Sequence, residues 1–284
     1  MEIITRQQRM ASVAKKLRRD NLVLGFVATM GALHEGHLSL IQKARQMCDQ
    51  VIVSVFVNPT QFNEETDFEQ YPRDLTADAE FLSPYDVDYV FAPEASEIYG
   101  DNFTTFVTVD DISDKLEGSS RPGHFRGVAT VVTILLNTIR PDFAFFGQKD
   151  AQQVAVIRRL VRDLRFDTEI VVMPIVREES GLALSSRNEL LSESDRAAAA
   201  VIYKSLQAAK EAFENGEKSS GNLTDKVSEV LDSEERARTD YIALVDPNSL
   251  EPVEKVGDDP VLLAVAARIG DVRLIDNVIL NEKQ

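Results

Sequence analysis

The amino-acid sequence predicts an α/β fold followed by a smaller α+β part. Along the first two-thirds of the chain, short apolar runs rich in Val, Ile and Phe alternate with helical segments. Runs that are apolar at every position are typical of parallel strands buried on both faces, and strand–helix alternation puts helices on both sides of the sheet. After about residue 189 the order changes to helices followed by strands. We therefore predict a Rossmann-like, doubly wound parallel sheet in residues 1–188 and a C-terminal α+β lid domain in residues 189–284.

Strands and helices of the first part are assigned from length and apolar periodicity. The strands are expected at 22–28, 51–57, 87–92, 143–146 and 170–176. The helices are expected at 37–47, at 75–82 after Asp74, at 127–139 and at 152–164. In the last of these, Val154, Ile157, Leu160, Val161 and Leu164 fall on one stripe, which indicates one buried face.

The second part begins with a long predicted helix. Ser192 and Ser194 are N-cap candidates for a helix that runs to Phe213 and ends at Asn215–Gly216. A shorter helix is expected at about 223–231. Strands are then expected at 241–245, 261–268 and 272–279, with Gly270–Asp271 as a hairpin turn between the last two.

Composition narrows the class of protein. With 284 residues, 44% apolar and 27% charged, the chain is long enough for a well-filled core. A formal charge of −16 argues against nucleic acid or an anionic membrane as partner. The single cysteine, Cys48, lies in an apolar helical stretch and fits a buried side chain in a reducing compartment. The sequence shows neither a signal peptide nor an apolar run of membrane-spanning length, so we expect a cytoplasmic protein.

Residues 29–37, TMGALHEGH, join the first strand to its helix. Gly31 and Gly36 allow a ligand to approach the backbone closely, and a helix start offers N–H groups to phosphate. His34 and His37 can both face that position and hydrogen-bond a developing phosphate charge. A metal site is the weaker alternative, because no further His or Cys lies at ligand spacing.

Two later segments carry cationic and hydroxyl groups. Ser185, Ser186 and Arg187 follow the fifth strand and can clamp phosphoryl oxygens, although such a turn also caps a helix. Lys149 lies in the loop after the fourth strand and can bind a triphosphate, while Asp150 can hold ribose hydroxyls or cap a helix. A His-x-Gly-His motif at 34–37 together with a Ser/Arg loop after the last parallel strand resembles the layout of adenylate-forming nucleotidyltransferase folds, which implies that the two loops would close on ATP from opposite sides.

Three other polar positions are candidates. Gln61, after the second strand, and Gln153 suit a small ligand bearing hydroxyls and a carboxylate, or are loop amides. The basic turn at 121–127 can add charge to phosphates or act as a lid. Segments 58–71 and 121–127 are candidates for closure over the site.

These segments, in order and spacing, resemble the pantoate–β-alanine ligase (pantothenate synthetase) family of HIGH-motif nucleotidyltransferases. The resemblance is carried by 29–37, 55–62, 71–73, 121–127, 145–153 and 185–188. It implies an ATP-dependent ligase that forms an amide bond between (R)-pantoate and β-alanine through a pantoyl adenylate. AMP and pyrophosphate would be released, and the enzyme would be a homodimer that uses Mg²⁺.

The same resemblance assigns site residues. It places His37, His34, Lys149, Ser185, Ser186 and Arg187 in catalysis, with His37 as proton donor. It implies that ATP contacts Met30, Gly31, Ala32, Leu33, His34, Glu35, Gly36, His37, Gly147, Gln148, Lys149, Asp150, Val176, Leu184, Ser185, Ser186 and Arg187. Gln61 and Gln153 would hold pantoate, and Gln61 would also border β-alanine. Asp78 is a candidate metal-side carboxylate, with Mg²⁺ carried mainly by the ATP phosphates.

The sequence leaves three rival functions open. A nucleotidyltransferase that keeps the nucleotide on its product would not release AMP. A tRNA-charging enzyme shares the first motif, but the acidic charge and short chain argue against it. A nucleotide-binding module without turnover would bind ATP and release no pyrophosphate.

Overall fold

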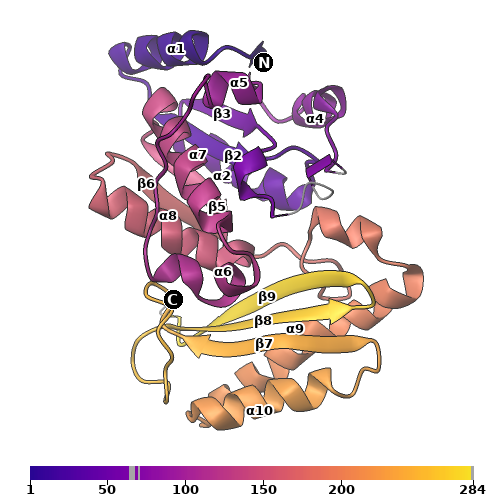
Figure 1. Cartoon of the computed structure of the whole chain (residues 1–284). Coiled ribbons are helices and arrows are strands. Elements are labelled where there is room, and N and C mark those ends of the chain that lie inside the picture. The colour runs from indigo at the N-terminus through magenta and orange to yellow at the C-terminus, as the bar shows by residue number, and fades with distance from the viewer. Residues whose placement is uncertain (64–67, 70, 283–284) are drawn as a thin grey trace. The chain divides into compact units, whose positions relative to one another are not determined.

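The computed structural model describes residues 1–63, 68–69 and 71–282. The chain divides into two compact units, Met1–Gly147 with Val156–Met173, and Gln148–Ala155 with Pro174–Gln284. Each unit has its own sheet (Figure 1). The predicted boundary at residue 189 falls inside the second unit, which also takes in the segment 148–155 that follows the fourth predicted strand.

The first unit holds a six-stranded sheet in which every pairing is parallel. Its strands are β1 (Glu2–Ile4), β2 (Leu24–Thr29), β3 (Gln50–Val55), β4 (Tyr89–Phe91), β5 (Phe143–Gly147) and β6 (Glu169–Met173), in the order β1-β4-β3-β2-β5-β6. The predicted doubly wound sheet is confirmed. β1 was not predicted, because three residues at a sheet edge are too few to show a pattern.

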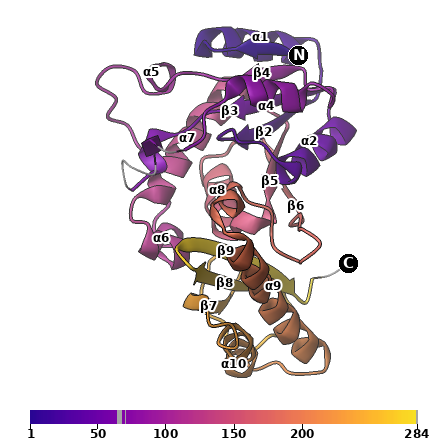
Figure 2. The same ribbon diagram turned by 90° about the vertical axis from the view of Figure 1, so that its right-hand side faces the viewer.

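Helices cover this sheet on both faces. The helices along this part of the chain are α1 (Gln7–Arg19), α2 (Glu35–Met47), α4 (Leu75–Leu82), α5 (Ala95–Ile98), α6 (Leu116–Ser120), α7 (His124–Ile139) and α8 (Ala151–Asp163). Ile41 and Ala44 of α2 and Leu82 of α4 pack with Val53 and Phe145 of the sheet. α1 contacts α7, and Figure 2 shows α7 and α2 on opposite sides of β2.

The strand order reverses between β2 and β5. These two strands are neighbours, with Val27 opposite Phe145, yet the chain leaves β2 toward β3 and leaves β5 toward β6 on the other side. In open parallel sheets, ligands bind beyond the carboxyl ends of the strands at such a reversal. β2 ends at Thr29 and β5 ends at Gly147, so both predicted motifs start at this edge.

In the second unit, two helices pack on a three-stranded antiparallel sheet. The elements are α9 (Glu193–Glu214), α10 (Ser220–Leu231), β7 (Ala237–Val245), β8 (Val261–Ile269) and β9 (Val272–Leu280), in the strand order β7-β8-β9. The Ser192 side chain caps α9 by accepting the Asp195 N–H at 3.1 Å, as predicted. Both helices bury their apolar residues against the sheet, and Figure 2 shows the two helices beside its strands.

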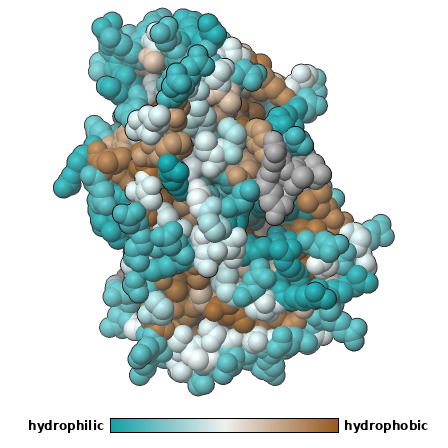
Figure 3. Space-filling view, in the orientation of Figure 1, coloured by the Kyte–Doolittle hydropathy of each residue, from teal (hydrophilic) through white to brown (hydrophobic). Residues whose placement is uncertain are grey.

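The surface carries many hydrophilic side chains. In the face shown in Figure 3, hydrophilic side chains are spread over both units. Among the residues that the structure describes, no helix is both long and apolar enough to cross a bilayer.

Candidate active site

The loop between β2 and α2 has a left-handed backbone. Gly31 has φ +84° and Ala32 has φ 51°. A Cβ on Gly31 would lie 2.7 Å from Asp78 Oδ2, so a glycine is required both by φ and by space. Asp78 Oδ1 accepts the Leu33 N–H at 3.0 Å, and the Ala32 N–H also hydrogen-bonds this carboxylate. The buried Asp78 side chain therefore ties α4 to the loop.

Burial dominates the electrostatics of Asp78. It raises the pKa of the carboxyl group, while the two backbone hydrogen bonds oppose that rise. These contacts are to the backbone of the loop. Among the described residues, no group of three or more His, Cys, Asp and Glu side chains is placed to hold a metal ion.

The two histidines of the first motif face each other at the start of α2. Their ring centroids are 4.2 Å apart. His34 Nδ1 accepts the Gly36 N–H at 3.1 Å, and His37 Nδ1 accepts the His34 N–H at 3.3 Å. Because both Nδ1 atoms act as acceptors, each neutral ring carries its proton on Nε2. Each ring thus presents an Nε2–H donor beside the positive end of the helix.

Gln61 closes a short 3₁₀ turn, η1 (Pro59–Gln61), that follows β3. It is 8% exposed, and its Nε2 lies 2.7 Å from the Met30 sulfur. Asn58 Nδ2 donates to Gln61 Oε1 at 3.1 Å, which fixes the amide with its Nε2 toward Met30. The structure therefore brings Gln61 to the first motif, although the two are far apart in sequence.

A hydrogen-bond network supports that turn. Tyr99 donates its hydroxyl proton to Asn58 Oδ1 at 2.6 Å, and the pKa of Tyr99 is raised mainly by burial. α7 packs directly on the turn, since a Cβ on Gly127 would lie 2.4 Å from the Thr60 carbonyl oxygen. The turn has little room to move.

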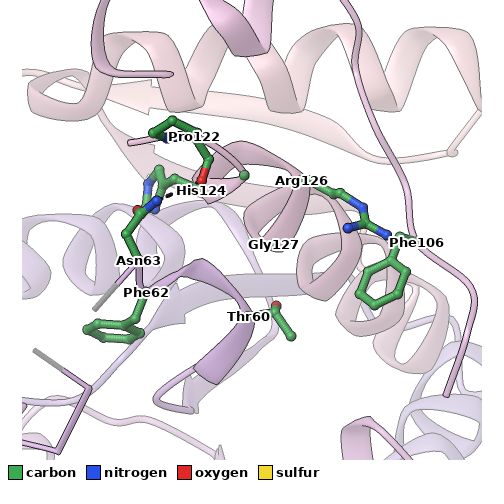
Figure 4. Close-up of a pocket in the computed structure, with 9 residues that line it drawn as sticks. Thr60, Phe62, Asn63, Phe106, Pro122, His124, Arg126 and Gly127 are labelled. Atoms are coloured by element: carbon green, nitrogen blue, oxygen red, sulfur yellow. Dashed lines mark hydrogen bonds between the residues drawn. The ribbon is translucent and has the colours of Figure 1, made fainter. Parts of the chain in front are cut away.

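The basic turn at 121–127 borders the same η1 turn. His124 Nδ1 donates to the Gln61 carbonyl at 2.8 Å, and Arg121 Nη1 lies 3.3 Å from His124 Nε2. Beside it is a pocket of about 270 Å³ lined by Thr60, Phe62, Asn63, Phe106, Pro122, Gly123, His124, Arg126 and Gly127 (Figure 4). The Arg126 guanidinium lies 3.8 Å from the centroid of the Phe106 ring at the rim of this pocket.

The segment after β5 belongs to the second unit from Gln148 onward. It forms the 3₁₀ turn η3 (Gln148–Asp150) before α8. Lys149 Nζ lies 3.7 Å from Asp150 Oδ1, and the Lys149 side chain is 19% exposed. The half-buried Gln153 is in the first turn of α8, with the buried Gln152 beside it.

A tight hairpin precedes the Ser185–Arg187 segment. Leu184 N–H donates to the Val176 carbonyl at 3.0 Å, and Arg177 pairs with Ala183. This brings Val176, the predicted contact of adenine, beside Leu184, the first residue of the predicted second phosphate loop. Ser185 then caps the turn η4 (Ser186–Leu190) by accepting the Arg187 N–H at 3.3 Å.

Two residues of the last strand were missed by sequence reasoning. Asp276 and Asn277 are 4% and 3% exposed in β9 and contact the segments just described. Their signal in the sequence is a pair of polar residues inside an otherwise apolar strand, which requires buried partners.

The chain is similar to known proteins over its whole length. A sequence profile described as pantoate-beta-alanine ligase matches residues 2–279. A relative from Thermosipho africanus named pantothenate synthetase is 49% identical over 280 residues, covering 99% of this chain and 100% of the relative. One from Thermotoga neapolitana with the same name is 49% identical over 280 residues, with the same coverage.

Solved structures of the same family are also similar to this chain. A pantothenate synthetase from Thermus thermophilus has a TM-score of 0.91 and 41% identity, covering 98% of this chain and 99% of that one. A pantoate-beta-alanine ligase from Francisella tularensis, complexed with β-γ ATP and β-alanine, has a TM-score of 0.81 and 39% identity, covering 100% and 99%.

Proposed function

We infer the roles of individual residues from the premise that this chain belongs to the pantoate–β-alanine ligase family. It is an ATP-dependent ligase that joins pantoate to β-alanine and releases AMP and pyrophosphate. The observation that carries the assignment of roles is the pair of Nε2–H donors at the start of α2, directly after the switch-point strand β2.

The reaction requires activation of a carboxylate, because oxide is a poor leaving group. The pantoate carboxylate attacks the α-phosphorus of ATP, forming a P–O bond as the bond to pyrophosphate breaks, and the product is pantoyl adenylate. Negative charge builds on phosphoryl oxygens during this step. Catalysis therefore depends on preorganised donors rather than on a side-chain nucleophile. In the second step the amine of β-alanine attacks the acyl carbon, AMP leaves and an amine proton is lost.

The donors of the first unit are His34 and His37. Their Nε2–H groups suit phosphoryl oxygens, and His37 would donate its proton as charge develops on the leaving group. The backbone from Met30 to Gly36 would complete this part of the ATP site, since Gly31 leaves room at the loop and α2 contributes its positive end.

Lys149 and Arg187 are the proposed cationic groups. Lys149 would bind phosphate and Asp150 would contact ribose, while Gly147 and Gln148 lead into that turn. Ser185, Ser186 and Arg187 would hold phosphoryl oxygens. Support for these roles comes from the backbone hydrogen bond between Leu184 and Val176, which brings the start of this phosphate loop beside the proposed adenine contact Val176.

Gln61 and Gln153 are the proposed pantoate ligands. The Asn58 hydrogen bond turns Gln61 Nε2 toward Met30, so this amide would donate to the carboxylate or hydroxyl oxygen of pantoate. Gln61 would also border β-alanine. Gln153 lies in the first turn of α8, shortly after Lys149 in the sequence, and its amide would also bind pantoate.

Three general properties complete the proposal. Mg²⁺ would act with the β- and γ-phosphates, because this ion keeps its waters and binds through substrate phosphates. Asp78 would then hold the backbone of the loop between β2 and α2 rather than bind the metal ion. The family resemblance also implies a cytoplasmic homodimer formed through the larger unit, and sedimentation analysis would test the dimer.

The first experiment is exchange of labelled pyrophosphate into ATP with Mg²⁺ and (R)-pantoate, without β-alanine. Exchange that depends on (R)-pantoate, and that (S)-pantoate supports poorly, is expected for an acyl-adenylate half-reaction. AMP should appear as a final product only after β-alanine is added. ATP binding without exchange would contradict this order of steps and favour a module without turnover. AMP retained on the product would indicate the rival nucleotidyltransferase.

A further inference from the structure

The last strand, β9, contacts two separate nucleotide-binding segments of its own unit. Asn277 Nδ2 donates to the carbonyl oxygens of Gln148 and Lys149 at 3.0 and 3.1 Å. Its Oδ1 accepts from Gln148 Nε2 at 3.2 Å. One buried amide therefore holds the turn that carries Lys149 through three hydrogen bonds.

The neighbouring residue holds the other segment. Asp276 forms a bidentate ion pair with Arg177, with N–O distances of 2.6 and 2.9 Å. The Arg177 guanidinium also donates to the Gly181 carbonyl at 3.0 Å and lies 4.0 Å from the centroid of the Tyr203 ring. Arg177 follows Val176 directly in the hairpin that leads to Ser185–Arg187. The ion pair thus fixes the base of that hairpin.

The alternation of a strand explains how adjacent residues reach different segments. Successive side chains point to opposite faces of a sheet. Leu274 and Leu280 share the face of Asp276 and belong to the core beneath α9 and α10. Asn277 is on the other face, where β9 contacts η3.

Placing Asp276 in that apolar layer is costly for stability. Its side chain is 3% exposed, and burial raises the pKa of the carboxyl group while Arg177 and, more weakly, Lys149 oppose the rise. Replacing the buried ion pair with two hydrophobic residues of similar size would leave the stability of the core unchanged or raise it. A functional reason is therefore needed for the ion pair.

We propose that Asp276 and Asn277 are positioning residues for the adenylation step, holding the Lys149 turn and the hairpin before Ser185 in one frame. The inference rests on the proposed phosphate-binding role of Lys149. Neither residue needs to touch a substrate. The donors on these two segments need only keep a fixed geometry, since a misplacement of about 1 Å can cost on the order of 10²-fold in rate.

The test of Asn277 is a double-mutant cycle. Asn277→Ala is measured alone and in a Lys149→Ala background, in pyrophosphate exchange and in the reaction of supplied pantoyl adenylate with β-alanine. We expect a loss of on the order of 10- to 100-fold in exchange for Asn277→Ala alone, and little change in the second reaction. In the Lys149→Ala background the same substitution should cost less than about threefold, because Asn277 acts through Lys149.

A matched control is Asn281→Ala. Asn281 Nδ2 donates to the Gly257 carbonyl at 3.0 Å at an exposed position just after β9, so the substitution removes a similar hydrogen bond away from the Lys149 turn. It should leave both reactions unchanged. Equal losses for Asn277→Ala in both backgrounds, or in both half-reactions, would overturn the positioning role. Near-normal exchange by Lys149→Ala alone would instead overturn the role of Lys149, and the inference with it.

Asp276 is tested by removing the ion pair as a whole. Arg177→Met with Asp276→Leu leaves no buried charge and keeps an apolar contact for Tyr203, so the unit should fold. We expect the KM for ATP to rise about tenfold or more, with the KM for pantoate unchanged. An unchanged KM for ATP in the folded double variant would refute the role of the pair. The Asn277 cycle decides the inference if the double variant does not fold.

Discussion

Replacing Asp78 tests how the proposed ATP-binding loop between β2 and α2 is held. Asp78→Ala removes the acceptor of two backbone N–H groups, those of Leu33 and Ala32, in a loop whose backbone is left-handed at Gly31 and Ala32. Asp78→Asn keeps one carbonyl oxygen as an acceptor and removes the charge. The two variants therefore separate loss of the hydrogen bonds from loss of charge.

The magnitude follows from the contacts. A buried backbone donor left without a partner costs about 1–3 kcal/mol, so two such donors give about 2–6 kcal/mol against the native loop. The energy regained by relieving the desolvation of a buried carboxylate lowers this figure, and we expect about 2–3 kcal/mol for Asp78→Ala. Since about 1.4 kcal/mol corresponds to a factor of ten, the rate of pyrophosphate exchange should fall about 30- to 150-fold. Asp78→Asn should lower the rate of pyrophosphate exchange by less than Asp78→Ala does.

The assay is exchange at several Mg²⁺ concentrations, with Asp74→Ala as the matched control. Asp74 caps the same helix, accepting the Ala77 N–H at 2.9 Å, but its side chain is exposed and its hydrogen bond is to the helix rather than to the loop. The substitution should cost about 1 kcal/mol of stability and leave exchange near normal. Wild-type exchange by Asp78→Ala would refute the loop argument. Recovery of its activity at high Mg²⁺ would show that Asp78 acts on the metal instead.

Three further predictions concern other parts of the site and the core. His37→Ala and Lys149→Ala should each slow exchange by on the order of 10²-fold or more, because each removes a donor to the developing charge; near-normal turnover by both would contradict these roles. Gly127→Ala places a methyl group 2.4 Å from the Thr60 carbonyl oxygen, so it should cost about 1–3 kcal/mol of stability in urea unfolding and raise the KM for pantoate by shifting the Gln61 turn. Burial raises the pKa of the Cys48 thiol to about 11, so at pH 8 only about 0.1% is thiolate and alkylation should be slow in the native protein and fast in urea. Rapid alkylation of the native protein would contradict that environment.

The pH dependence of Cys48 has a definite sign. Its pKa in the folded protein lies above the ordinary value of 9.0, so the folded state holds the thiol proton more tightly than the unfolded state does. The resulting contribution to stability is present below about pH 9 and is lost as the pH rises through about 11. Replacing Cys48 by Ala should therefore flatten the fall in thermal stability over this range.

Much of the fold follows from the sequence alone. Continuous apolar runs that are short and rich in Val, Ile and Phe are typical of strands covered on both faces, which favours the parallel sheet of the first unit. Capping and turn residues such as Ser192 and Gly270 mark where elements begin and turn in the second unit. The motifs at 29–37, 145–153 and 185–188 identify the family without any structure, because their residue types and spacing together are specific.

Other features were decided by tertiary structure. No local pattern indicates that Gln61 meets Met30, that Asp78 holds the backbone of the first loop, or that Asn277 holds the Lys149 turn. These contacts join segments far apart in the chain, and their partners are backbone groups or sulfur, which leave no mark on side-chain patterning. The sequence determined which elements form and which chemical groups are present, because both depend on local residue type and period. Only packing decided which of those groups meet and which side chains support them.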